Sequence, residues 1–113
     1  MKKILISLLF LPIFLFSQTP QQIDSVLGVY KKTNIDTVKI KLLNTLSKMH
    51  LVTGDFDAAI SFSNQGITLS TDKLKKIKSL TKREDEIFNI GLAESYLLKG
   101  MTLSDKGDYK NAK

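Results

Sequence analysis

The sequence predicts an all-α protein in which antiparallel helical hairpins stack side by side as a short α-solenoid. Apolar residues recur at intervals of three and four along most of the chain, which is the period of an amphipathic helix. A Gly-Asp-aromatic triplet occurs twice, at residues 54–56 and 107–109, each time after such a segment. Because Gly is favoured just past a helix end and Asp can cap the next helix, each triplet predicts a tight turn between two helices.

The composition argues against an enzyme. The chain of 113 residues contains no Cys, which excludes disulfides, thiolate metal sites and cysteine nucleophiles. The single histidine, His50, has no partner at a catalytic spacing, and the known nucleotide-binding and hydrolase motifs are absent. Four aspartates lack the spacing of a calcium loop: Asp55, Asp57, Asp105 and Asp108. We therefore predict no catalysis, no metal and no cofactor.

The positive charge is modest once the N-terminal segment is set aside. The formal net charge of +6 falls to +4 without Lys2 and Lys3. Other basic residues gather over residues 73–83, without interleaved aromatic residues or a recognition motif. Nucleic-acid binding needs basic residues on one face beside side chains that contact bases. We therefore predict no nucleic-acid partner and a solvated basic connector over residues 73–81, with an anion-binding patch as the alternative.

The N-terminal segment has the pattern of a secretory signal. Two lysines precede an apolar run at residues 4–16, and the small Ser17 follows. As a helix this run would span only about 20 Å, against about 30 Å for the hydrocarbon core of a bilayer. We predict a signal peptide over residues 1–17 and a secreted or periplasmic protein. A retained membrane anchor is the weaker alternative.

The first helix after the signal is predicted over residues 20–32, within a leading segment of residues 18–35. Thr19 can cap free N–H groups, and Pro20 is tolerated in the first helical turn. One apolar stripe follows at helical spacing: Ile23, Val26, Leu27 and Tyr30. We expect this helix to cover the open end of the first hairpin, with a plain linker as the alternative.

The first complete hairpin is predicted over residues 36–72. Asp36 caps its first helix, and Gly54 ends that helix. The expected core face of the first helix consists of Val38, Leu42, Leu43, Leu46 and Met49. The corresponding face of the second helix consists of Phe56, Ala59, Ile60, Ser63, Gly66 and Ile67. A break at residues 70–72 is expected to end the second helix.

An incomplete second hairpin is predicted over residues 82–113. Thr81 and Glu84 have the spacing of a capping box, which starts a long helix running to about residue 106. The turn at Gly107 follows, and the chain stops at Lys113 where the next helix should begin. The sequence therefore predicts truncation within the second repeat.

The segment around the second turn resembles the first helix and turn of a tetratricopeptide repeat (TPR). The matching positions are Tyr96, Gly100, Gly107, Asp108, Tyr109 and Ala112. The first hairpin is a looser copy, with Leu43, Ser47, Gly54, Asp55, Phe56 and Ala59. In that family these positions mark where paired helices interlock. The two turns lie 53 residues apart, whereas the family repeat is about 34 residues.

The resemblance implies an exported TPR scaffold that binds a protein or peptide and performs no catalysis itself. A signal-like start followed by loose repeats is also similar to the sensory part of TPR-containing membrane histidine kinases and transcriptional regulators. That similarity implies signal transduction, although kinase, ATP-binding and DNA-binding segments are absent. A cationic peripheral protein on membrane surfaces is the third hypothesis.

The resemblance also implies a concave groove lined by the first helix of each repeat. Lys41, Asn44 and Lys48 fall on the polar side of such a helix, at i, i+3 and i+7. This row can hydrogen-bond an acidic peptide or a C-terminal carboxylate, and a solvated polar face is the alternative. The exposed last helix would offer a second surface, for self-association.

Overall fold

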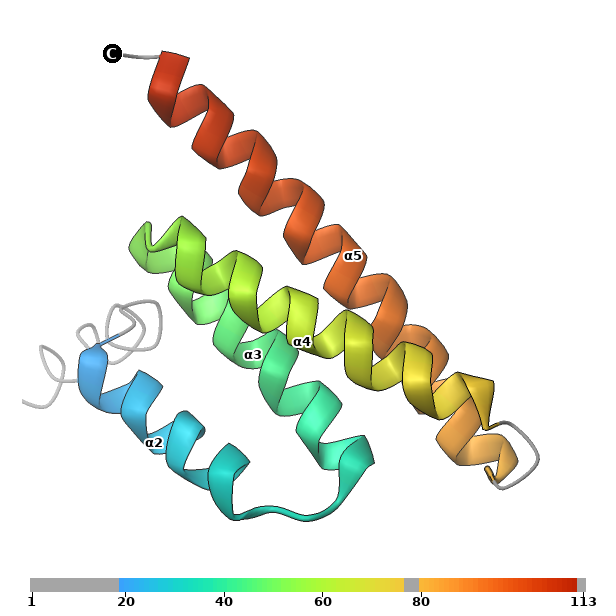
Figure 1. Cartoon of the computed structure of the whole chain (residues 1–113). Coiled ribbons are helices and arrows are strands. Elements are labelled where there is room, and N and C mark those ends of the chain that lie inside the picture. The colour runs from blue at the N-terminus through green and yellow to red at the C-terminus, as the bar shows by residue number, and fades with distance from the viewer. Residues whose placement is uncertain (1–18, 77–79, 112–113) are drawn as a thin grey trace, which may run out of the picture.

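The computed structural model describes residues 19–76 and 80–111, and these residues form four helices and no strand (Figure 1). The helices are α2 (Pro20–Lys32), α3 (Asp36–Thr53), α4 (Phe56–Lys75) and α5 (Lys82–Asn111). The predicted all-α fold is confirmed. The predicted signal peptide, residues 1–17, and the repeat position Ala112 lie outside the described residues.

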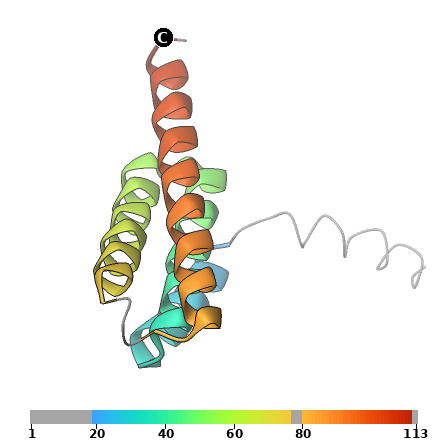
Figure 2. The same ribbon diagram turned by 90° about the vertical axis from the view of Figure 1, so that its right-hand side faces the viewer.

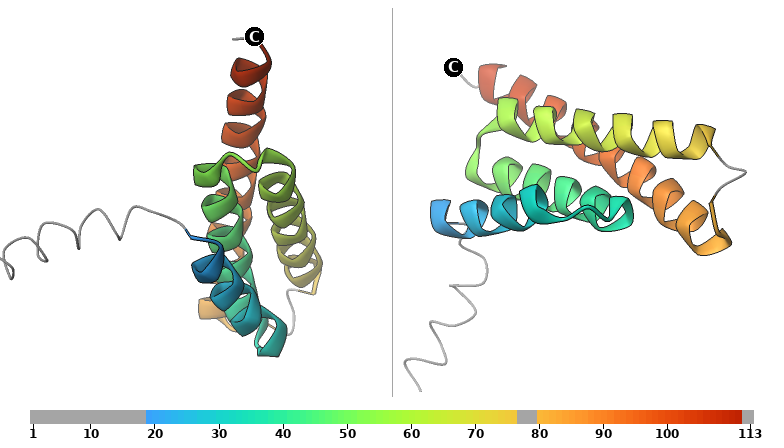
Figure 3. Two further views of the ribbon diagram at one scale, coloured as in Figure 1. Left: turned by 90° about the vertical axis from the view of Figure 1, so that its left-hand side faces the viewer. Right: turned by 60° about the horizontal axis from the view of Figure 1, so that its bottom comes forward.

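The helices pack around α3. It forms an antiparallel hairpin with α4, and α5 packs mainly on α4 while also contacting α3 (Figures 1 and 3). On its other side α3 is covered by α2. Figure 2 and the left view of Figure 3 show that α5 extends past the turn between α3 and α4. This arrangement is compatible with stacked TPR-like hairpins.

Local side-chain chemistry sets several helix ends as predicted. The hydroxyl of Thr19 accepts a hydrogen bond from the Gln22 N–H at 3.1 Å, and the Gln22 side chain accepts from the Thr19 N–H at 3.0 Å. Thr81 and Glu84 form the same reciprocal pair at the start of α5, at 3.1 Å in both directions.

The turn between α3 and α4 also forms as predicted. Gly54 has φ of 85°, the left-handed conformation that costs Gly least, and its position ends α3. The carboxylate of Asp55 then accepts a hydrogen bond from the Ala58 N–H at 3.2 Å and caps α4. The sequence Gly54-Asp55 therefore fixes both helix ends by local interactions alone.

The start of α3 differs from the expectation. Asp36 does not cap the helix, because Ile35 occupies the capping position and Asp36 is the first helical residue. Its carboxylate instead forms an ion pair with the Lys73 ammonium at 2.6 Å. The hydrogen bond and the negative charge of Asp36 together raise the pKa of Lys73. The ion pair ties the first turn of α3 to the last turns of α4.

The predicted break at residues 70–72 is wrong. Helix α4 continues to Lys75, and Ser70 is completely buried within it. The ion pair made by Lys73 gives the last turns of α4 tertiary support that local propensity cannot reveal. The predicted basic connector of residues 73–81 therefore begins inside the helix.

The predicted turn at residues 107–109 is also wrong. Helix α5 passes through Gly107 and Asp108 without interruption, and among the described residues only Gly54 has a positive φ. Phe56 and Tyr109 are therefore not at equivalent hairpin corners. Gly adopts helical angles as well as left-handed ones, and no further helix packs on this end of α5 in the described part of the chain. The helical hydrogen bonds of α5 therefore continue through Gly107 and Asp108.

The core lies where α3, α4 and α5 meet. Its buried apolar residues are Ile40, Leu43, Leu46, Met49, Ala59, Phe88 and Leu98. The expected core positions Val38 and Leu42 are only half-buried, whereas Ile40 was not expected and is completely buried. The reason is that α5 contacts α3 as well as α4, so the most buried side of α3 is the side that carries Ile40.

Candidate functional site

Asn44 lies inside the junction of α3 and α5, and this corrects its predicted place in an exposed row. It is 2% exposed. Its side-chain amide donates to the Gly91 carbonyl at 3.0 Å, and its side-chain oxygen accepts from the Ser95 hydroxyl at 2.7 Å. Since both ends of the amide bind protein atoms, Asn44 holds helices together and is not free for an incoming ligand.

Two glycines allow the helices to approach this closely. A Cβ atom on Gly91 would lie 2.4 Å from Ile40 Cγ1, and one on Gly66 would lie 2.5 Å from the Ser95 hydroxyl. Both glycines are buried. Gly66 was expected on the core face of its helix, and the close approach of Ser95 gives a packing reason for a glycine there.

Lys41 and Lys48, the other two predicted groove residues, are exposed on the side of α3 that lies between α2 and α5. Each lines a separate hollow. The first, of about 240 Å³, is bordered by Lys41 and Asn44 from α3 and, from α5, by Ile87, Ile90, Gly91 and Glu94. The second, of about 390 Å³, is bordered by Val26, Thr45, Lys48, Met49, Val52 and Glu94. Glu94 thus belongs to both.

We call the surface formed by these two hollows the α3 groove. It combines two ammonium groups, one carboxylate and several apolar side chains within reach of a single bound segment. Glu94 was missed by the sequence analysis because it comes from another helix. The sequence did hold one indication of Glu94. The two Gly-Asp-aromatic triplets are 53 residues apart, and Glu94 follows Lys41 by the same 53 residues, so each lies at the same distance before its triplet.

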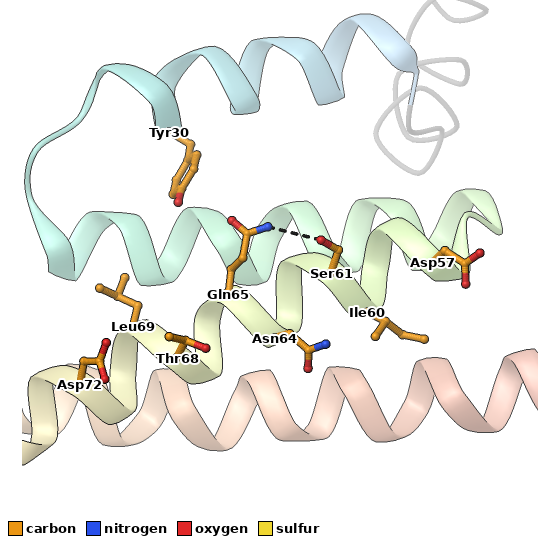
Figure 4. A pocket seen from close by; sticks show the side chains of 9 residues that line it. All are labelled: Tyr30, Asp57, Ile60, Ser61, Asn64, Gln65, Thr68, Leu69 and Asp72. Atoms are coloured by element: carbon orange, nitrogen blue, oxygen red, sulfur yellow. Dashed lines mark hydrogen bonds between the residues drawn. The ribbon is translucent and has the colours of Figure 1, made fainter.

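A second groove runs between α2 and α4 (Figure 4). It is a shallow hollow of about 700 Å³, largely open to solvent, and it is lined by Tyr30 of α2 and by α4 residues Asp57, Ile60, Ser61, Asn64, Gln65, Thr68, Leu69 and Asp72. The carboxylate of Asp57 is held by the Lys106 ammonium at 2.7 Å. Most of the α4 residues are exposed and spread along the helix, so they form a broad polar surface without converging reactive groups.

His50 packs against its neighbours. Its ring stacks on Phe62 with the centroids 5.4 Å apart, and its Nδ1 lies 3.7 Å from the Asp55 carboxylate. No group of three or more metal-ligating side chains occurs within residues 19–76 and 80–111. None of the helices in those ranges is long and apolar enough to cross a membrane.

The predicted repeat positions behave differently in the two copies. In the first, Ala59 is completely buried and its carbonyl accepts a hydrogen bond from the Ser47 hydroxyl at 2.8 Å, which joins α3 to α4. In the second, Tyr96 and Gly100 are exposed on α5. A Cβ atom on Gly100 would meet no neighbouring atom within 4 Å, and Tyr96 is 56% exposed.

Comparison with protein families relates the C-terminal part of the chain to a known repeat. Residues 93–113 match the family model of the tetratricopeptide repeat, so a TPR repeat occupies this end of the chain. Such repeats are typically non-catalytic modules that mediate protein–protein binding. No curated protein and no solved structure matches the chain.

Proposed function

We propose that this protein is an exported interaction module that binds a peptide segment of a protein partner in the α3 groove. The TPR repeat supports the class of function. The observation that supports the site is the position of Lys41 and Lys48, which are exposed and border two hollows joined by Glu94. Export is proposed from the sequence of residues 1–17.

The side chains of the α3 groove define the chemistry of a fitting segment. Lys41 and Lys48 lie about 10 Å apart along the helix, at about 1.5 Å per residue, and each can donate to a carboxylate. Val26, Met49 and Val52 offer apolar contact in the larger hollow. We therefore propose an acidic peptide that carries one apolar side chain, bound with its carboxylates toward α3.

Loss of the Lys48 ammonium is expected to weaken peptide binding about tenfold. Hydrogen bonds to charged groups contribute about 1.5–3 kcal/mol, and 1.4 kcal/mol corresponds to a factor of ten. The measurement is fluorescence anisotropy with a peptide selected against the full chain from a displayed library, for wild type and Lys48→Ala. Lys75→Ala, an exposed charge on α4, is the control and should bind as wild type does.

Two outcomes would contradict this site. Equal affinity of wild type and Lys48→Ala would place the peptide elsewhere on the protein. Failure to select any peptide that binds the full chain would remove the α3 groove from consideration altogether.

The export proposal has its own test. Expression of the full chain in a bacterial host with an intact secretion pathway should give a periplasmic protein shortened near residue 17. Deletion of residues 1–17 should leave the protein in the cytoplasm. Recovery of the uncleaved chain from the cytoplasmic fraction would contradict export, whereas the uncleaved chain in the membrane fraction would favour a retained anchor.

A further inference from the structure

The side of α5 that points away from the core is rich in exposed apolar residues. Phe88, Ser95 and Thr102 follow one another at intervals of seven residues and mark the buried side of this helix. On the rest of the helix, five large apolar side chains are 46–67% exposed: Ile90, Tyr96, Leu97, Met101 and Leu103. We call these residues the outer face of α5. Large exposed apolar side chains gathered on one helix in this way mark an interaction surface more often than scattered single residues do.

Two small residues lie among the large side chains of the outer face. Ala93 is exposed between the large side chains, and a Cβ atom on Gly100 would meet no neighbouring atom within 4 Å. A second helix can therefore approach the backbone of α5 closely at these points. From Ile90 to Leu103 the face extends about 20 Å at 1.5 Å per residue, which matches three to four turns of a partner helix.

The fully exposed charges beside the outer face, between residues 86 and 108, have one sign, whereas Lys82 and Arg83 at the start of α5 are exposed basic residues. Every exposed charged side chain of α5 between residues 86 and 108 is acidic: Glu86, Glu94, Asp105 and Asp108. The two basic residues in this stretch, Lys99 and Lys106, are only half-exposed, and Lys106 is bound to Asp57. Four exposed acidic residues along one helix are unusual in a chain whose net charge is +6.

We propose that the outer face of α5 docks an amphipathic helix of another polypeptide, whose apolar stripe is flanked by lysine or arginine. Leu97 and Met101 would contact the centre of the stripe, because they are exposed one turn apart midway along the face. Basic residues toward the two ends of that helix would lie near Glu86 and Asp108, which are about 33 Å apart along α5 at about 1.5 Å per residue. A second copy of this chain fits less well, because its α5 would bring the same four carboxylates against these.

The outer face adjoins the α3 groove, because Ile90 and Glu94 also border its hollows, but the residues changed in the tests below do not. Leu97, Met101, Glu86 and Asp108 do not border either hollow beside Lys41 and Lys48. The two proposals can therefore fail independently. Lys48→Ala is expected to leave binding at the outer face unchanged.

The test uses two labelled model peptides of about 18 residues, long enough for five helical turns. Both carry the same leucine stripe, and the polar positions are lysine in one and glutamate in the other. We expect the Leu/Lys peptide to bind the full chain in anisotropy titrations and the Leu/Glu peptide to bind at least tenfold more weakly. Equal binding of the two peptides would overturn the proposal.

Variants of the protein then locate the site. The double substitution Leu97→Gln and Met101→Gln should weaken the Leu/Lys peptide about tenfold or more, since each lost apolar contact costs on the order of 1 kcal/mol. Val29→Gln changes a residue on α2 that is 54% exposed, and it should bind as wild type does. Circular dichroism of all three proteins checks that the helices are retained. An unchanged affinity in the double variant would overturn the proposal.

Charge reversal and sedimentation complete the test. The double substitution Glu86→Lys and Asp108→Lys should reverse the preference between the two peptides. Sedimentation of the full chain should give the same oligomeric state for wild type and the Leu97→Gln, Met101→Gln variant. If wild type is a dimer that this variant dissociates, the outer face binds a second copy and the proposed occupant is wrong.

Discussion

Replacement of Phe88 by alanine is expected to destabilise the folded chain by about 3–5 kcal/mol, the usual cost of removing a buried aromatic ring. Phe88 is 1% exposed and is the largest of the fully buried side chains. A domain of this size has a total stability of about 5–15 kcal/mol, so the variant should be substantially unfolded at mild denaturant concentrations. Urea unfolding followed by circular dichroism measures the change.

A neighbouring residue supplies the control. Ile90 lies two positions later on α5 and is 67% exposed, so Ile90→Ala should change the free energy of unfolding by less than about 0.5 kcal/mol. If Phe88→Ala costs no more than Ile90→Ala, α5 does not share a core with α3 and α4. The arrangement of three packed helices would then be wrong.

Gly91→Ala is expected to destabilise the chain by about 1–3 kcal/mol, the usual cost of overpacking. The new Cβ atom would lie 2.4 Å from Ile40 Cγ1, and Ile40 is completely buried. This cost opposes the preference of about 1 kcal/mol for alanine over glycine within a helix. Gly100→Ala, where a Cβ atom meets nothing within 4 Å, should show that preference alone and stabilise the chain.

A double substitution tests the contact itself. Ile40→Ala removes Cγ1 and should cost about 2–5 kcal/mol alone, because it leaves a cavity. Combined with Gly91→Ala it should cost at least about 1 kcal/mol less than the two single changes added together, since the new methyl group fills part of that cavity. Strict additivity, or stabilisation by Gly91→Ala alone, would show that α3 and α5 are not in contact there.

Features set by neighbouring residues could be predicted from the sequence. The capping pair at Thr81 and the turn at Gly54 need only a few adjacent residues, and both formed as expected. The triplet at Gly107 carries the same local signal, yet the helix continues through it. The difference is tertiary, because α4 packs on α3 after the first turn and no described helix packs after the second.

The candidate groove was predictable to the same extent. Lys41 and Lys48 could be placed on one side of α3 by helical spacing, and they do border the hollows. Asn44 has a spacing suited to the same row, but α5 covers it. Glu94 enters the groove only through the packing of α5 on α3, so spacing within one helix could not identify its position.

The polar contacts of Asn44 also restrict how α5 can be aligned along its own axis. A shift of α5 by one turn, about 5.4 Å, would carry the Gly91 carbonyl and the Ser95 hydroxyl away from the Asn44 amide. The shift would also move Gly91 away from Ile40 and bring a larger residue into its place. An apolar seam alone tolerates such sliding, whereas this polar contact permits a single register between the helices.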